Sequence, residues 1–165
     1  MRGASRGSRQ VFLPKSMTPD SDSAALDRQL AYLVFRLTLG INILVHGAGR
    51  IFVTLGGPGA EAFATTTAAE FTKTALPAGL VHAFLFVLPF AEVVLGALTT
   101  LGLFTRWTLV LGGLMITVLV FGTAMRSDWN TVGVQMIYAI TYYLLLVNRA
   151  QNRFSLDALV GKNKG

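Results

Sequence analysis

The sequence predicts an all-α integral membrane protein, a four-helix bundle with both termini in the cytoplasm. Only 13% of its 165 residues are charged and 53% are hydrophobic, whereas about a quarter of the residues in a soluble domain are charged. Residues 107–125 contain no charged residue, and residues 85–105 contain only Glu92. Runs of this length match the ~20 residues with which a helix crosses the hydrocarbon core of a bilayer.

Each predicted span is a helix, because a helix satisfies its backbone hydrogen bonds within one segment, as lipid demands. The expected spans are residues 30–52, 78–104, 107–125 and 132–147. Two polar, basic tails flank this membrane domain, residues 1–29 and residues 149–165. We expect the N-terminal tail to be disordered up to a helix cap at Asp22 or Ser23.

A longer loop, residues 53–77, separates the first two spans. Its Gly-Gly-Pro-Gly (56–59) is expected to end the first helix. Its Ala-, Glu- and Phe-containing part is expected to form a short interfacial helix with Phe63 and Phe71 facing lipid. In the third span, Gly112 and Gly113 are expected to allow close helix packing.

The distribution of Lys and Arg predicts the orientation. Ten of them lie on the side of the two termini, and three lie on the opposite side. Because cytoplasmic segments carry the excess of basic residues, we expect both termini in the cytoplasm and a multi-pass protein of the bacterial inner membrane. The net charge of +6 then reflects topology and contact with anionic lipid, so no nucleic-acid partner is expected.

The absence of cysteine excludes several kinds of redox site within the chain itself. Thiol–disulfide chemistry, a Cys-ligated metal and an iron–sulfur cluster all require cysteine. No covalently bound cofactor and no metal site are predicted.

Several polar residues occur inside the spans. In the first span, Asn42, His46 and Arg50 share one helix face because they are spaced four residues apart. Counting ~1.5 Å per residue from the outer helix ends predicts a polar pocket near the outer face. Its expected members are His46, Arg50, His82, Gln135 and Tyr138.

Arg36 and Glu92 lie deeper, at compatible depths in the inner half. A charge at the bilayer centre costs ~3 kcal/mol or more. We therefore expect Arg36 and Glu92 to form a structural ion pair between the first two spans.

The predicted pocket suits a quinone, whose carbonyl oxygens need hydrogen-bond donors in an apolar site. His46 and His82 would donate to the head group or relay protons. Arg50 would hold a carbonyl or an anionic substrate such as a sulfur oxyanion. Two other interpretations stay open. In the first, the polar groups serve only as interhelical hydrogen bonds. In the second, the two histidines ligate a haem, but crowding by Phe84 and Phe86 disfavours a haem at this position.

Two stretches resemble the DoxX family of small four-helix membrane proteins. They are "RLTLGINILVHGAGRIF" (36–52) and "PFAEVVLGALTTLGLFTRW" (89–107). The resemblance covers roughly residues 30–148, although the family often has Lys where this chain has Arg50. The positions that match the motifs are Arg36, His46, Arg50, Glu92 and Arg106.

The resemblance implies the four-helix membrane fold and says less about activity. One branch of the family is similar to a subunit of a thiosulfate:quinone oxidoreductase. The leading hypothesis is therefore a membrane subunit of a redox system that contacts quinone near the outer leaflet, with a redox-enzyme partner. The alternatives are a non-enzymatic scaffold or assembly factor for a partner protein, and a small transporter that works as a homo-oligomer.

Overall fold

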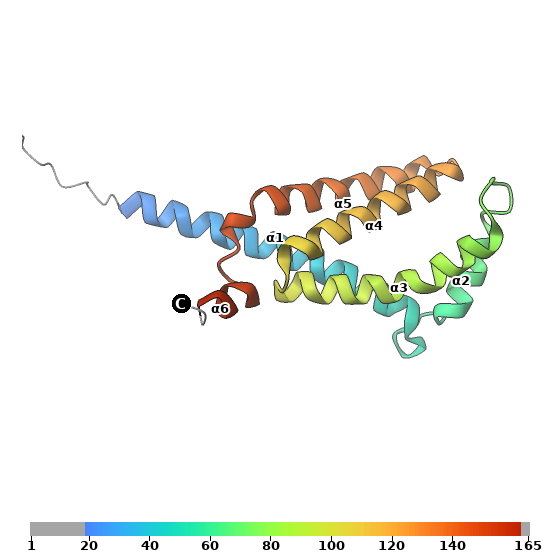
Figure 1. Ribbon diagram of the computed structural model, residues 1–165, viewed down its shortest axis with the longest axis horizontal. Coiled ribbons are helices and arrows are strands. Elements are labelled where there is room, and N and C mark those ends of the chain that lie inside the picture. The colour runs from blue at the N-terminus through green and yellow to red at the C-terminus, as the bar shows by residue number, and fades with distance from the viewer. Residues whose placement is uncertain (1–18, 163–165) are drawn as a thin grey trace, which may run out of the picture.

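The computed structural model describes residues 19–162, and all regular structure within that range is helical. Four helices are long and apolar enough to cross a membrane, which confirms the predicted fold class. Shorter helices connect or follow them (Figure 1). In chain order the elements are α1 (Pro19–Ile51), η1 (Val53–Leu55), α2 (Ala60–Ala69), α3 (Ala78–Leu101), α4 (Thr105–Met125), α5 (Trp129–Val147), η2 (Arg149–Gln151) and α6 (Leu156–Lys162).

The first helix starts earlier than predicted. α1 begins at Pro19, so Asp22 and Ser23 lie inside its first turns and do not precede it. Proline is favoured at the first helical position, and acidic residues in the first turn interact favourably with the helix dipole. The helix thus starts about one turn before the predicted cap, while residues 1–18 lie outside the described part of the chain.

Two other boundaries shift by about one turn. α3 ends at Leu101, because Gly102 takes the left-handed conformation with φ 65° that commonly ends a helix. α5 begins at Trp129, because the Asp128 carboxylate accepts a hydrogen bond from the Thr131 N–H and caps the helix.

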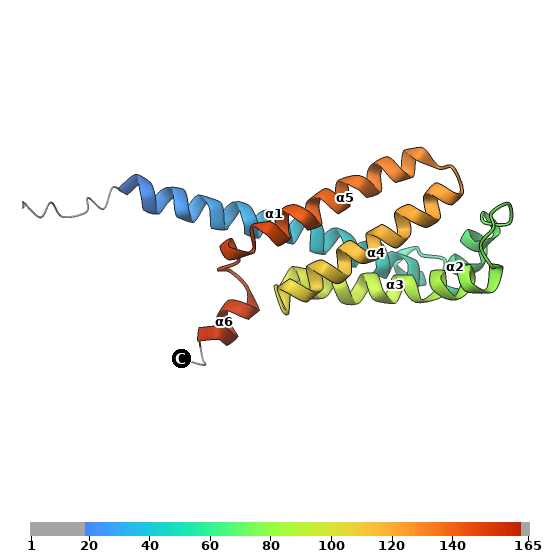
Figure 2. The ribbon, with the colours of Figure 1, turned by 45° about the horizontal axis from the view of Figure 1, so that its top comes forward.

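The bundle consists of two closely packed helix pairs. α1 packs closely against α3 at glycine positions: a Cβ on Gly47 would come within 2.6 Å of the Pro89 carbonyl oxygen. α4 meets α5 at Gly112, whose Hα side faces the Tyr142 ring with no space for a methyl group. The pairs meet near the α3–α4 turn and diverge toward the end where α2 lies (Figure 2). We call the two ends of the bundle the α6 end and the α2 end.

α2 covers the part of α3 that extends beyond α1. Ala64 of α2 is fully buried against Val81 and Leu85 of α3. Phe63 and Phe71 pack against the same apolar cluster. The prediction of a short helix in this loop is thus confirmed, but its phenylalanines turn toward the protein, because α3 offers them an apolar surface.

Candidate functional site

A buried ion pair links α1 and α3. Arg50 Nη1 donates to both carboxylate oxygens of Glu92, each at 2.6 Å. The Glu92 side chain is 2% exposed and that of Arg50 is 24% exposed. The Arg50 guanidinium also lies over the Phe63 ring, 4.5 Å from its centroid. The pair therefore joins three elements, α1, α2 and α3, around one carboxylate.

The predicted partner of Glu92 was wrong. Counting from the helix ends placed Arg36 level with Glu92, on the assumption that α1 and α3 end at the same depth. Gly47 instead packs against Pro89 and Glu92, and Gly40 packs against Thr100. The end of α1 thus lies beside the middle of α3, and this stagger brings Arg50 to Glu92.

Arg36 instead anchors the C-terminal segment at the α6 end. It is 2% exposed, and its Nη2 donates to the Phe154 carbonyl oxygen at 2.8 Å. Its guanidinium fills the space next to Gly102 that a side chain would need. Nearby, the Asp157 carboxylate accepts the N–H groups of Phe104 and Thr105 at 2.8 and 2.7 Å. Burial alone would raise the pKa of Asp157, but these hydrogen bonds lower it overall.

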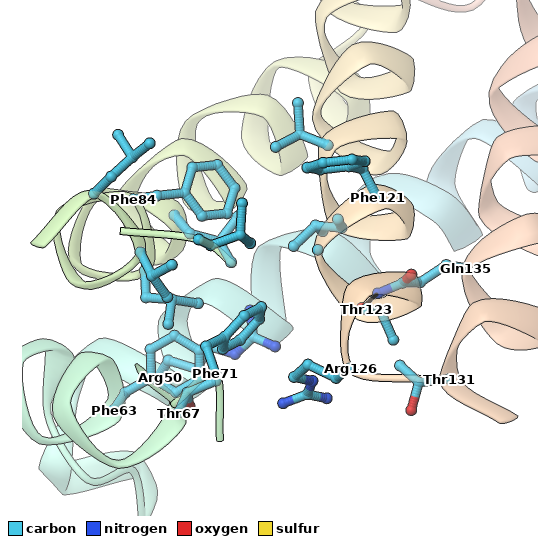
Figure 3. A pocket seen from close by; sticks show the side chains of 18 residues that line it. Arg50, Phe63, Thr67, Phe71, Phe84, Phe121, Thr123, Arg126, Thr131 and Gln135 are labelled. Atoms are coloured by element: carbon cyan, nitrogen blue, oxygen red, sulfur yellow. Dashed lines mark hydrogen bonds between the residues drawn. The ribbon is translucent and has the colours of Figure 1, made fainter. Parts of the chain in front are cut away.

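A cavity of about 370 Å³ lies between the two helix pairs, toward the α2 end. Most of its wall is aromatic or aliphatic, with Phe63, Phe71, Phe84 and Phe121 among the lining side chains (Figure 3). Its polar lining residues are Arg50, Thr67, Thr123, Arg126, Thr131 and Gln135. An apolar pocket with a few polar groups is the usual form of a small-molecule site.

Two polar atoms of this lining are buried without a hydrogen-bond partner among residues 19–162. They are Nε of Arg126 and Oε1 of Gln135. The Gln135 amide is oriented by its Nε2, which donates to Thr123 Oγ1 at 2.9 Å. Since buried polar groups are normally hydrogen-bonded, the residues of the cavity wall hold one donor and one acceptor that lack a partner.

Arg126 is held from two sides at the α2 end. Its Nη1 pairs with Glu70, and its Nη2 donates to Asp128 at 3.3 Å. The guanidinium lies over the Phe71 ring, 5.0 Å from its centroid. Hydrogen bonds from Thr131 are the main cause of a lowered pKa of Asp128, and Arg126 lowers it further. Arg126 therefore ties the α4–α5 turn to the segment that follows α2.

Only two of the five predicted pocket residues, Arg50 and Gln135, line this cavity. His46 is exposed and lies one turn before Arg50 on α1, outside the cavity. Its Nε2 is 2.8 Å from Arg50 Nη2. His82 faces α2, with Nε2 3.2 Å from Glu61 and 3.4 Å from Thr65.

Tyr138, the remaining predicted member, points toward α1. Its hydroxyl donates to Asn42 Oδ1 at 3.1 Å. Arg106, the fifth position that matches the family motifs, is exposed beside Trp107.

The structure adds Arg126, Phe63 and Phe71 to the site. The sequence placed Arg126 in an external turn and both phenylalanines in lipid. One signal was available: Glu70 directly precedes Phe71, and an acidic residue at the end of an apolar helix is a natural partner for an arginine in a facing turn.

Comparison with known proteins gave one match. The model of the family described as DoxX matches residues 31–125, which run from α1 through α4. α5 lies beyond the matched range, although the resemblance extended to it. No curated protein and no solved structure matches the chain.

Proposed function

The chain belongs to the DoxX family, and we propose that it is the membrane subunit of a redox system and binds a quinone in the cavity between the helix pairs. The observation that supports this most directly is the pair of unpartnered atoms in that cavity, Arg126 Nε and Gln135 Oε1. A quinone carbonyl accepts a hydrogen bond, and the hydroxyl of its reduced form donates one. The two atoms therefore complement both redox forms of one head group.

The rest of the cavity suits the apolar part of such a ligand. Its volume of about 370 Å³ falls in the range of about 300–1,000 Å³ typical of small-molecule sites. The aromatic wall can pack against a quinone ring. Because the helix pairs diverge at this end (Figure 2), an isoprenoid chain would leave between them toward lipid.

In this proposal Arg126 and Gln135 take over the head-group contacts that the sequence assigned to His82. Arg50 is neutralised by Glu92 and fixed by His46, so it presents a guanidinium of fixed position at the cavity wall. His46 loses its proposed contact with the head group, because it does not line the cavity and its Nε2 accepts a hydrogen bond from Arg50 Nη2. Electrons would come from a partner subunit, since the cysteine-free chain supplies no thiolate ligands for an iron–sulfur centre.

We also propose that the protein lies in the bacterial inner membrane with both termini in the cytoplasm. The excess of basic residues at the α6 end supports this orientation. The quinone cavity would then lie toward the outer leaflet.

Quinone binding can be tested by tryptophan fluorescence, because quinones quench indole emission on contact. The chain has two tryptophans. Trp129 precedes the cavity residue Thr131, and Trp107 lies near the opposite end of the bundle. In a Trp107→Phe background, decylubiquinone should quench Trp129 saturably.

The deciding comparison uses two substitutions on α5. Gln135→Leu removes the acceptor for the hydroxyl of the reduced head group, so it should raise the dissociation constant of decylubiquinol, measured by its displacement of decylubiquinone, about tenfold, the cost expected of an unpaired buried group. Thr141→Val removes a hydroxyl that bonds only to its own helix and should leave binding unchanged. Non-saturable quenching, or equal affinity in all three proteins, would refute the quinone site and favour a scaffold function.

A further inference from the structure

A polar row runs along the exposed side of α1. Thr38, Asn42 and His46 are spaced one turn apart, and all three are exposed. With neighbouring residues of α1 they line a shallow groove that contains only α1 side chains. We call Thr38, Asn42 and His46 the α1 polar row.

This row lies at membrane depth. Asn42 Oδ1 accepts the hydrogen bond of Tyr138, and Tyr138 is the middle residue of the membrane-spanning α5. Asn42 therefore lies within the membrane-spanning part of α1. Polar side chains at this depth almost always face protein.

Two donors in the row lack a partner within residues 19–162. Asn42 uses only its Oδ1, so its Nδ2 hydrogens are free. Arg50 can only donate, so the Nε2 of His46 must accept and its hydrogen must lie on Nδ1. That Nδ1–H faces no acceptor in the described chain. Lipid tails offer neither group an acceptor.

We propose that a second copy of this chain covers the α1 polar row, forming a two-fold dimer in the membrane. Two copies inserted in the same direction place Asn42 at the same depth, and a two-fold axis along the membrane normal makes the row face itself. A carboxamide is self-complementary: each Asn42 Nδ2 donates to the other Asn42 Oδ1, whose second lone pair keeps the Tyr138 bond. Interhelical hydrogen bonds of this kind are common in membrane bundles.

Cysteine cross-linking tests this contact in native membranes, because the natural chain has no cysteine. Val45 is 61% exposed and lies on the same face of α1, one turn from Asn42. Its replacement by Cys leaves the row intact and should give a disulfide-linked dimer on oxidation, which requires Cα atoms within about 7 Å.

Leu114→Cys is the matched control. Leu114 is 56% exposed on α4, close to Gly112, which packs against Tyr142, one turn from Tyr138. It is thus at a similar depth, but it is exposed on α4, outside the core cluster that joins α4 to α1. A Val45→Cys dimer that does not exceed the Leu114→Cys dimer would overturn the proposal, as would a cross-link chiefly to another protein.

Two further substitutions in the Val45→Cys background separate the dimer contact from the fold. Asn42→Leu should weaken dimerisation about tenfold, because it removes both reciprocal hydrogen bonds. Tyr138→Phe removes only the bond within one copy and should leave dimerisation unchanged. Equal cross-linking in the Asn42→Leu variant would refute the role of the amide.

Discussion

The Arg50–Glu92 pair gives a quantitative test of the stagger between α1 and α3. Replacing Glu92 by Gln keeps the shape of the side chain but leaves the Arg50 charge without its counter-ion. Removing one partner of a buried pair usually costs about 3–5 kcal/mol. Because Arg50 is 24% exposed and keeps its contact with His46, we expect a smaller loss of about 2–3 kcal/mol.

The coupling between the two residues is the sharper quantity. Arg50→Gln combined with Glu92→Gln removes both charges, so it should be more stable than the sum of the single losses predicts. We expect an interaction free energy of about 1–3 kcal/mol, as for residues in direct contact. Unfolding by SDS titration in mixed micelles, followed by circular dichroism, measures all four proteins.

The matched cycle uses Arg36→Gln with Glu92→Gln. Arg36 bonds to Phe154 and does not touch Glu92, so these losses should add within about 0.5 kcal/mol. If the Arg36 cycle showed the larger coupling, the stagger and the whole site built on it would be wrong.

Three further predictions concern other parts of the molecule. Gly47→Val should separate α1 from α3 and destabilise the bundle by several kcal/mol, because the α3 backbone at Pro89 and Val93 leaves no space for the new side chain. SDS titration would measure this loss of stability, and an unfolding midpoint equal to wild type would contradict the prediction. Asp157 has a lowered pKa in the folded chain, so the stability that it contributes is present above its unfolded pKa of about 3.9 and is lost as the pH falls through the folded value. Hydrogen-exchange protection factors in α6 should therefore fall on acidification, and Asp157→Asn should abolish that dependence; a pH profile equal to wild type would exclude Asp157 as its source. For topology, an impermeant maleimide should label Thr72→Cys in intact cells and Gly161→Cys only after lysis, and the reverse pattern would invert the orientation.

The fold could be predicted because the bilayer imposes strong constraints on composition. Uninterrupted apolar stretches specify four spans, and Gly-Gly-Pro-Gly specifies where the first one ends. The start of α1 was placed at Asp22 or Ser23, about one turn late, because Asp and Ser are typical helix caps and equally common within a first turn. A helix extending beyond the membrane needs polar residues, so hydropathy alone cannot mark its end.

The site was harder to predict, for one geometric reason. Residue counting assumes that neighbouring helices end at one level, and α1 ends beside the middle of α3. That stagger exchanged the partners of Glu92, whereas His82 is outside the cavity because it lies on the face of α3 that α2 covers. The close approach of α1 and α3 at Gly47 sets the stagger. The sequence shows that Gly47 is small enough for close packing, but it does not show which residue of the neighbouring helix packs against it.

The contact between Arg36 and Phe154 also bears on how the protein is made. The two residues are 118 positions apart, and the carboxylate that caps α4 belongs to the same late segment. During synthesis the first three helices must therefore enter the membrane while Arg36 still lacks its native partner. The bundle can close around that arginine only after Phe154 has left the ribosome, so a product truncated before Phe154 would carry a buried cation that cellular quality control can recognise.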